Sequence, residues 1–242
     1  MNKVCIFNDE EEVSKAAAAF ILEHSKKSIE NKGRFTIALS GGKTPSLLYN
    51  LLAQLPYSKE LHWKTIFIFW GDERCVPHDS DQNNSHMAKK LLLDHVPIPR
   101  ENIFPVQVQM QAGKAALQYE QMLKVFFKQE LPVFDLILLG MGEDGHTASL
   151  FPGTETTSTQ SLVNAVKKPA DQTERITFTP QLINNAKQVL FLVTGKNKAD
   201  ILKEVLENKS KNKYPVQLIH PKNGKTLWYA DKPAATLLKK IK

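Results

Sequence analysis

Short apolar runs alternate along the chain with longer stretches in which apolar residues recur every three or four positions. The runs are rich in β-branched and aromatic residues and end in glycine or polar residues, which is typical of buried strands. They lie at 35–39, 65–70, 134–139, 188–193 and 226–230, and an alternating run lies at 175–179. The run at 134–139 stands between Pro132 and Gly140 and predicts a fully buried strand of a parallel sheet.

Apolar residues at helical spacing predict helices between these runs. One face of a first helix is marked by Val13, Ala16, Ala17, Phe20, Ile21 and His24. Asn8 and Glu11 are expected to cap this helix. Further helices are predicted from Pro45 to about residue 55, near 86–92, over 111–130 and up to residue 207. Thr179 and Asp231 are expected to begin two more, and 154–160 predicts a mobile surface loop.

The alternation of strands and helices predicts an α/β fold with a mostly parallel sheet that helices cover on both faces. The sequence contains no internal repeat, linker or low-complexity tract, so a single domain over residues 1–242 is expected. Glycine with polar or charged residues follows the strands at Gly41, Gly71, Gly140 and Gly195. Because parallel strands place these ends at one edge, where open α/β sheets bind ligands, we expect the site there. The side chains expected to converge are those of Arg74, Asp144, His146 and Lys198.

Composition narrows the classes of protein. The hydrophobic share of 42% and the charged share of 24% are ordinary for a globular protein. No apolar run approaches the ~20 residues that span a bilayer, and the first residues do not resemble a secretory signal. Cys5 and Cys75 stand far apart without a CxxC pair, so a reducing cytoplasm is the expected location.

The net charge of +7 favours solubility, and it also suits anionic small substrates or nucleic acid as partners. The Lys-rich stretches at 196–213 and 239–242 have no interleaved aromatic residues and no nucleic-acid motif. A small anionic substrate is therefore favoured, with no nucleic-acid or membrane partner and a monomer or small homo-oligomer as the expected state.

The loop after the predicted strand 134–139 carries the candidate chemistry. Three glycines, Gly140, Gly142 and Gly145, surround a carboxylate and an imidazole, Asp144 and His146. Glycine allows positive φ and close approach of the backbone to a ligand. A plain turn needs no such combination, so this loop is the first candidate for a catalytic site.

A second candidate is the segment Ser40-Gly41-Gly42-Lys43-Thr44, which stands between a predicted strand and a helix. Free backbone N–H groups and the positive end of the helix dipole make such a helix N-terminus suitable for an anion. The spacing matches neither a Walker loop nor a dinucleotide fingerprint. Taken alone, the segment indicates an anion site without identifying the anion.

Five segments of the chain together resemble the successive motifs of 6-phosphogluconolactonases. They are 40–45, 72–77, 139–153, 175–177 and 195–199, and their order and spacing match from end to end. The resemblance implies a three-layer Rossmann-like fold and hydrolysis of 6-phosphoglucono-1,5-lactone to 6-phosphogluconate in the oxidative pentose phosphate pathway. It implies no cofactor.

The same resemblance implies roles for single residues. His146 is the general base, with Asp144 beside it, while Arg74 and Lys198 hold the phosphate. The candidate substrate-binding residues are Ser40, Gly41, Gly42, Lys43, Thr44, Asp72, Arg74, Asn84, Gly142, Arg175 and Lys198. The chain departs from the family pattern in having Asn83 where serine is common and His220 where arginine is common.

Lactone hydrolysis suits these residues chemically. A lactone is an activated ester, so water and one base with an ordinary histidine pKa of ~6.5 are sufficient. Asp144 can orient the imidazole, and loop N–H groups can stabilise the oxyanion. Ser149 lies in no GxSxG elbow, and Cys75 is interpreted as a packing residue. The other histidines share no metal-ligand spacing, so no metal is expected.

Two alternative functions remain open. An amino-sugar 6-phosphate deaminase shares the fold and a similar loop, but that family has a glutamate where this chain has Phe151. Without that carboxylate, ring opening and isomerisation lose a group, which favours lactone hydrolysis. A non-catalytic sugar-phosphate sensor normally adds a helix-turn-helix segment, and the first predicted helix already begins near residue 9.

Overall fold

Six parallel strands form the central sheet in the part of the chain that the structure describes, residues 3–128, 130–154, 161–207 and 213–239. The structure is a computed structural model. The strand order is β1-β9-β8-β5-β2-β3. The strands are β1 (Lys3–Phe7), β9 (Lys225–Asp231), β8 (Gln188–Val193), β5 (Leu136–Leu139), β2 (Phe35–Leu39) and β3 (Ile66–Trp70). The predicted parallel sheet is confirmed.

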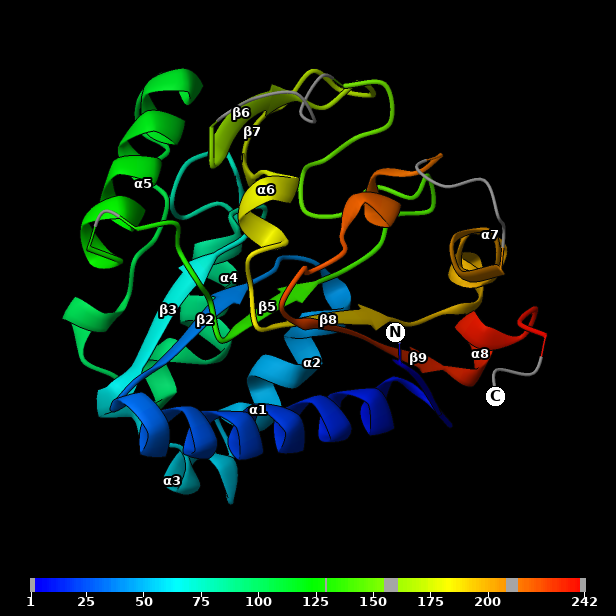
Figure 1. Ribbon diagram of the computed structural model, residues 1–242, viewed down its shortest axis with the longest axis horizontal. Helices are drawn as coiled ribbons and strands as arrows, with labels where there is room; N and C mark the ends of the chain where they lie inside the picture. Colours follow the sequence, from blue (N-terminus) through cyan, green and yellow to red (C-terminus); the bar gives the residue numbers. More distant parts are fainter. Residues whose placement is uncertain (1–2, 129, 155–160, 208–212, 240–242) are drawn as a thin grey trace.

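Helices flank this sheet, as predicted. Figure 1 shows α1, α2 and α3 on one side, with α5 and α6 on the other and α7 and α8 near the chain termini. The α-helices are α1 (Glu10–Lys32), α2 (Lys43–Leu52), α3 (Tyr57–Glu60), α4 (Asn84–Leu91), α5 (Ala112–Phe126), α6 (Pro180–Ile183), α7 (Ala199–Glu207) and α8 (Lys232–Ala235). Short 3-10 helices are η1 (Trp63–Thr65), η2 (Leu93–His95), η3 (Arg100–Asn102), η4 (Lys196–Lys198) and η5 (Pro215–Leu218).

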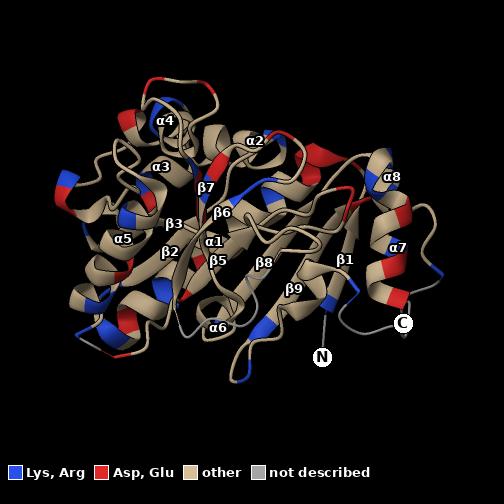
Figure 2. Ribbon diagram, turned by 90° about the horizontal axis from the view of Figure 1, so that it is seen from above, with Lys and Arg blue, Asp and Glu red and all other residues tan. Residues whose placement is uncertain are grey.

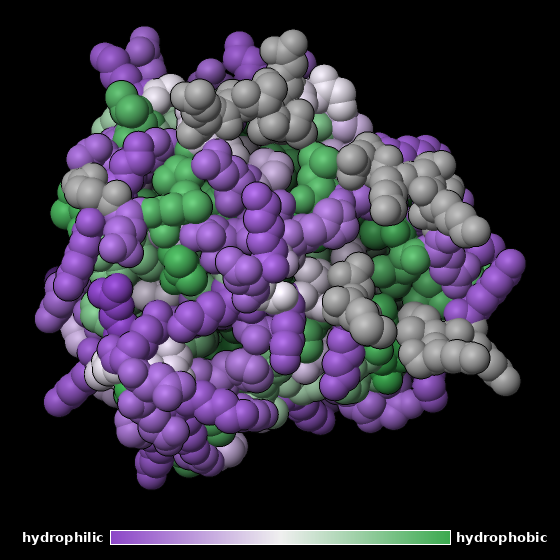
Figure 3. All heavy atoms as spheres, viewed as in Figure 1, coloured by the Kyte–Doolittle hydropathy of each residue, from purple (hydrophilic) through white to green (hydrophobic). Residues whose placement is uncertain are grey.

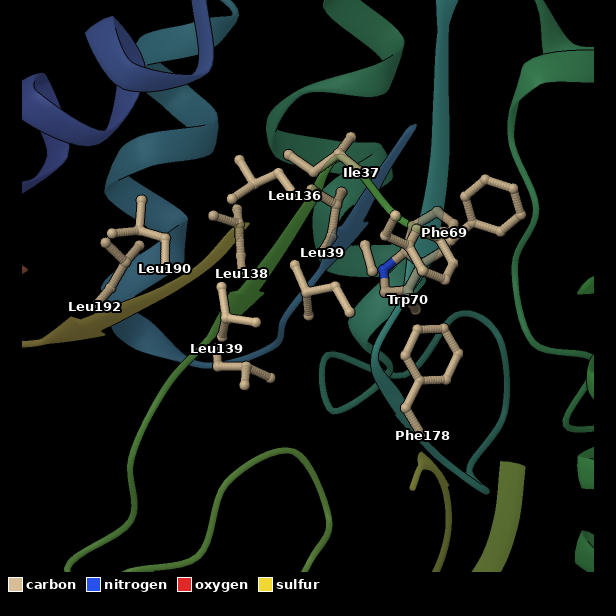
Figure 4. Packing of buried hydrophobic residues seen from close by; sticks show 14 of the residues in the cluster. Ile37, Leu39, Phe69, Trp70, Leu136, Leu138, Leu139, Phe178, Leu190 and Leu192 are labelled. Carbon is tan, nitrogen blue, oxygen red and sulfur yellow. The ribbon is translucent and has the colours of Figure 1, made fainter. Parts of the chain in front are cut away.

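The core lies where the middle strands meet. Every residue of β2 and β5 is buried, because elements cover both faces of the sheet. Figure 4 shows the leucines of β5 and β8 packed beside Ile37 and Leu39 of β2, with Phe69, Trp70 and Phe178 grouped next to them. This packing holds the carboxyl ends of the strands in fixed positions relative to one another.

A second sheet was not predicted. It contains β4 (Asp72–Arg74), β7 (Glu174–Phe178) and β6 (Val163–Lys167), which pair antiparallel in the order β4-β7-β6. Figure 1 shows β6 and β7 on the side of the central sheet that faces away from α1. Only 175–179 was expected as a strand there, because β4 consists of three charged residues and β6 has no continuous apolar run; both pair with β7.

Smaller expectations also need correction. Asp9, rather than Asn8, is the N-cap of α1 and accepts from the Glu12 N–H, while the Glu12 carboxylate accepts from the Asn8 N–H. Helix α2 ends at Leu52, before the expected residue 55. Strand β1 was missed. Of the expected loop 154–160, residues 155–160 lie outside the described residues.

On the surface, basic residues are mixed with acidic ones, and hydrophobic residues are mixed with hydrophilic ones. Figure 2 shows Lys and Arg segments scattered among acidic ones, and Figure 3 shows separate hydrophobic patches among hydrophilic residues on one face. Among the described helices, none combines the length and the apolar character that crossing a membrane requires.

Candidate active site

A cavity of about 500 Å³ opens at the carboxyl ends of the central strands. The loops after β2, β5 and β8 line it, together with residues of β4 and β7 from the small sheet. Its lining includes Ser40, Gly41, Gly42, Lys43, Thr44, Asp72, Arg74, Asn84, Gly142, His146, Arg175 and Lys198. The structure therefore brings together every predicted site residue except Asp144, which reaches the cavity only through His146.

Asp144 and His146 form a hydrogen-bonded pair within the loop after β5. The Asp144 Oδ1 lies 2.5 Å from His146 Nδ1 and accepts from the His146 backbone N–H at 3.1 Å. Burial by itself would raise the pKa of Asp144, but the His146 N–H and the nearby ring outweigh it and lower that pKa. Assigning the Nδ1 proton to this bond leaves Nε2 as the ring nitrogen that is able to accept a proton.

Gly142 is required by the closeness of this pair. A Cβ at Gly142 would lie 2.1 Å from His146 Nδ1 and 2.6 Å from Asp144 Oδ1. The Gly142 N–H also donates to the His146 carbonyl oxygen at 2.9 Å, and Thr147 Oγ1 donates to the Gly140 carbonyl at 2.8 Å. The loop thus holds the imidazole by short-range contacts that no larger residue at position 142 permits.

The segment after β2 forms the neighbouring wall. Gly42 is the N-cap of α2 and has no side chain that could occupy the free N–H groups of the first turn. The buried Tyr49 hydroxyl donates to the Ser40 carbonyl at 2.7 Å and fixes the start of the segment. A Cβ at Gly41 would lie 1.9 Å from Asn84 Oδ1, so glycine allows Asn84 to approach. These contacts leave the N-terminus of α2 facing the cavity.

The small sheet contributes charge. Arg74 of β4 stands opposite Arg175 of β7, and the Arg74 Nη1 donates to the Gln82 carbonyl at 2.8 Å. Burial, and then the nearby Arg74, lower the pKa of Arg175. Its buried Nε–H finds no acceptor among the described residues. Two neighbouring cations with an unused donor favour an anion between them.

Asp72 lines the cavity with its carboxylate already hydrogen-bonded to the protein. Its Oδ2 accepts from Ser149 Oγ at 2.7 Å, and its backbone carbonyl accepts from Asn84 Nδ2 at 2.9 Å. Ser149 is fully buried by these contacts. The position of Ser149 agrees with the expectation that it is no nucleophile.

Other residues at the cavity were missed from the sequence. Glu10, Thr194 and Asn197 also line it, and Asn197 Nδ2 donates to Glu143 Oε1 at 2.5 Å. Asn197 precedes Lys198 directly, so its place in the same strand-end loop was a usable signal. Glu10 begins α1, and no motif marks it.

Cys75, Asn83 and His220, the other residues considered from the sequence, do not line the cavity. Burial raises the pKa of the Cys75 thiol to about 11, which disfavours a nucleophilic thiolate. Asn83 is buried and caps α4 by accepting from the His86 N–H. His220 is exposed and does not line the cavity. Within the described part of the chain, no group of three or more His, Cys, Asp or Glu side chains is placed to hold a metal ion.

Comparison with known proteins identifies relatives of this chain. A family model described as glucosamine-6-phosphate isomerases/6-phosphogluconolactonase matches residues 8–228. A 6-phosphogluconolactonase of Haemophilus influenzae is 43% identical over 203 residues, covering 84% of this chain and 87% of the relative. One from a Nostoc species is 42% identical over 223 residues, covering 90% of each. The solved structure of the Trypanosoma cruzi 6-phosphogluconolactonase matches with a TM-score of 0.89 at 30% identity, covering 99% of this chain and 98% of that one.

Proposed function

Since the chain belongs to the family of glucosamine-6-phosphate isomerases and 6-phosphogluconolactonases and is a lactone hydrolase, we propose that His146 is its general base. The reaction is the hydrolysis of 6-phosphoglucono-1,5-lactone to 6-phosphogluconate in the oxidative pentose phosphate pathway. One observation carries the assignment of the base: His146 lines the cavity, with Asp144 bonded to its Nδ1. The free Nε2 is then the atom that meets the attacking water.

The reaction proceeds through a tetrahedral intermediate. His146 Nε2 takes a proton from water while the water oxygen bonds to the lactone carbonyl carbon. The bond from that carbon to the ring oxygen then breaks, and the imidazolium returns its proton to the ring oxygen, which becomes a hydroxyl group. Asp144 stabilises the imidazolium between these steps, as the carboxylate of a triad does. The product carboxylic acid ionises in water.

The oxyanion of the intermediate needs hydrogen-bond donors. The first-turn N–H groups of α2, next to Gly41 and Gly42, face the cavity at the positive end of the helix dipole. Donors held in place before the reaction stabilise a developing negative charge without reorganising. We assign this role to the segment Ser40–Gly42 together with the loop that carries Gly142.

The substrate phosphate is assigned to the basic side chains of the cavity. Arg74 and Arg175 stand opposite each other, and Lys198 follows the neighbouring strand β8. The unused Nε–H of Arg175 among the described residues supports an anionic ligand on this side. Arginine and lysine together supply both directional donors and charge to a phosphate.

The residue beside His146 favours lactone hydrolysis over deamination. Phe151 is buried, and its ring centroid lies 5.1 Å from that of His146. An aromatic ring therefore occupies the position at which the amino-sugar deaminases are expected to carry a carboxylate. Phe151 cannot transfer a proton, so the site has no carboxylate here to assist the ring opening that deamination requires.

The test is acid release from freshly prepared 6-phosphogluconolactone, corrected for spontaneous hydrolysis. Hydrolysis well above the spontaneous rate is expected from the wild-type protein. Ammonia release from glucosamine 6-phosphate without lactone hydrolysis would contradict the proposal. The cytoplasmic location, the oligomeric state and the absence of nucleic-acid partners stay predictions of the sequence.

A further inference from the structure

Glu73 is a buried carboxylate that the chemistry above does not use. It lies between Asp72 and Arg74, and its side chain is fully buried. Its Oε1 accepts from the backbone N–H groups of Arg74 at 2.8 Å and Asn84 at 2.7 Å. Its Oε2 accepts from the Ser85 N–H at 2.8 Å. Both oxygens are thus occupied by backbone donors from two separate elements.

These bonds join β4 to the first turn of α4. Asn84 and Ser85 are the first residues of α4, whose N–H groups have no partner inside the helix. A carboxylate at this end also suits the helix dipole. Glu73 therefore closes the loop at 75–83 by holding its two ends together.

Two cavity residues depend on this closure. The Arg74 guanidinium donates to the carbonyl of Gln82, which lies two residues before Asn84 on the loop that Glu73 closes. The Asn84 side chain donates to the Asp72 carbonyl and packs against Gly41. If Glu73 lost its bonds, the acceptor that orients Arg74 and the side chain of Asn84 would both be free to shift.

We propose that Glu73 is a positioning residue that sets the affinity of the site for phosphorylated lactones by holding Arg74 and Asn84 in place. The inference rests on the proposed function, because it concerns how the phosphate side of the same cavity is kept in shape. Glu73 itself does not line the cavity. Its effect on substrate therefore passes through the two residues that it holds.

Asn83 offers a matched control for helix stability. It is buried like Glu73 and anchors the same turn, because its Oδ1 accepts from the His86 N–H at 2.8 Å and from Ser85 Oγ at 2.6 Å. It does not line the cavity. Asn83→Ala should thus weaken the start of α4 while leaving the Glu73 bonds to Arg74 and Asn84 intact.

The experiment compares Glu73→Ala, Glu73→Gln and Asn83→Ala with wild type. It measures kcat and KM on 6-phosphogluconolactone, kcat/KM on glucono-1,5-lactone, and the melting temperature. We expect Glu73→Ala to raise KM for the phosphorylated lactone roughly tenfold, with kcat changed less than about threefold. Glu73→Gln keeps an acceptor oxygen and the volume, so it should raise KM by less. Both variants should lower kcat/KM on the unphosphorylated lactone less than on the phosphorylated one, because Arg74 contacts only the phosphate.

Asn83→Ala should lower the melting temperature while KM stays within about twofold of wild type. An equal rise of KM in Asn83→Ala would show that helix stability alone matters and would overturn the assignment. An unchanged KM in the folded Glu73 variants would overturn it as well, and Glu73→Gln decides if Glu73→Ala does not fold. Failure of the proposed function looks different, since wild type itself would then hydrolyse no lactone.

Discussion

At the scale of single residues, the site depends on atoms that are nearly in contact. Asp144, His146 and Gly142 come from one five-residue stretch, yet the imidazole is held by a carboxylate on one nitrogen and by glycine packing beside it. Such a pair sets which ring nitrogen is free to accept a proton. Replacing any of the three should therefore change turnover before it changes folding.

The first prediction concerns the base. His146→Asn should fold normally and lose about 10²- to 10⁴-fold in kcat, because general-base catalysis contributes that much. Asp144→Asn should lose less, since it removes orientation and charge but leaves the base. Rates of acid release and melting curves provide the measurement.

A pH profile of kcat/KM supplies the control for the base. The substrate phosphate also titrates near pH ~6, so an acidic limb in wild type has two possible sources. A limb that disappears in His146→Asn belongs to the histidine, whereas one that persists belongs to the substrate. Near-normal turnover by folded His146→Asn would make Asp144 the candidate base.

The second prediction concerns the phosphate. Arg74→Ala and Lys198→Ala should each lower kcat/KM for the phosphorylated lactone roughly ten- to 150-fold, because a charge-assisted contact is worth ~1.5–3 kcal/mol. The unphosphorylated lactone should be a poor substrate of wild type and change little in either variant. Equal losses on the two lactones would assign these residues to the chemistry or to folding.

The third prediction concerns Gly142. Gly142→Ala should lower kcat strongly, since the new Cβ would lie 2.1 Å from His146 Nδ1 and must displace the ring. Gly113→Ala is the matched control: its Cβ meets nothing within 4 Å and stands inside α5. That change should leave kcat unaltered, because Gly113 is the exposed second residue of α5. Normal turnover by Gly142→Ala would show that the loop can shift without harm.

At the scale of elements, one buried carboxylate joins four parts of the chain. Asp135, just before β5, accepts from the Thr36 N–H and hydroxyl of β2, both at 2.9 Å. Its oxygens also pair with Lys32 of α1 at 2.9 Å and with Lys187, just before β8, at 3.0 Å. Burial by itself would raise the pKa of Asp135, but Lys32 and Thr36 outweigh it and lower that pKa.

The fourth prediction follows from this junction. Asp135→Ala should lower the free energy of unfolding by about 3–5 kcal/mol, because it leaves Thr36 and two lysines without their shared acceptor. Denaturant unfolding measures the loss. Asp171→Ala, which removes the exposed ion pair to Lys168 and the bonds from Thr173, is the control and should cost far less stability. A similar small loss in both variants would show that the junction contributes little.

At the scale of the whole molecule, the cavity exists because two sheets meet. The central sheet presents the ends of β2, β5 and β8, and the small sheet adds Arg74 and Arg175 to the same cavity. The site thus combines a helix N-terminus, the loop of Asp144 and His146, and a basic wall from segments more than 100 residues apart. Folding of the whole chain is required to assemble it.

The fifth prediction is the pH dependence of stability. Burial raises the pKa of Glu73 to about 7. The hydrogen bonds from the N–H groups of Asn84, Arg74 and Ser85 lower this pKa, but burial outweighs them. The folded chain then binds this proton more tightly than the unfolded chain, whose glutamates titrate near ~4.3. Protonation of Glu73 therefore stabilises the folded chain. This stabilisation, roughly 3 kcal/mol, is fully present below pH ~4.3 and is lost as pH rises towards 7.

Asp135 acts in the opposite direction. Its lowered pKa contributes stability above pH ~3.9, which is lost as pH falls through the folded pKa. Asp72, Arg175, Cys75 and Tyr119 interact electrostatically with Glu73, and Arg74 binds it through its backbone N–H. Denaturant unfolding from pH 3 to 8 should show a decline above pH ~4.3 that Glu73→Gln removes and Asp135→Asn keeps. A decline that persists unchanged in Glu73→Gln would assign it to other groups.

The sequence by itself determined the elements whose pattern is local. Buried runs such as β8 and β2 were located to the residue, since an apolar run between polar ends is buried whatever its partner. The loop of Asp144 and His146 was equally visible, because all of its chemistry lies within a few positions.

Only the tertiary structure decided what depends on distant partners. Strand β4 consists of three charged residues and β6 has no continuous apolar run, so neither was recognised alone, and both pair with β7. The place of Glu10 at the cavity and the bonds of Glu73 to α4 likewise join segments that no local spacing connects. A sequence pattern records which residues avoid water, whereas the partner of a buried polar group is fixed by how the elements pack.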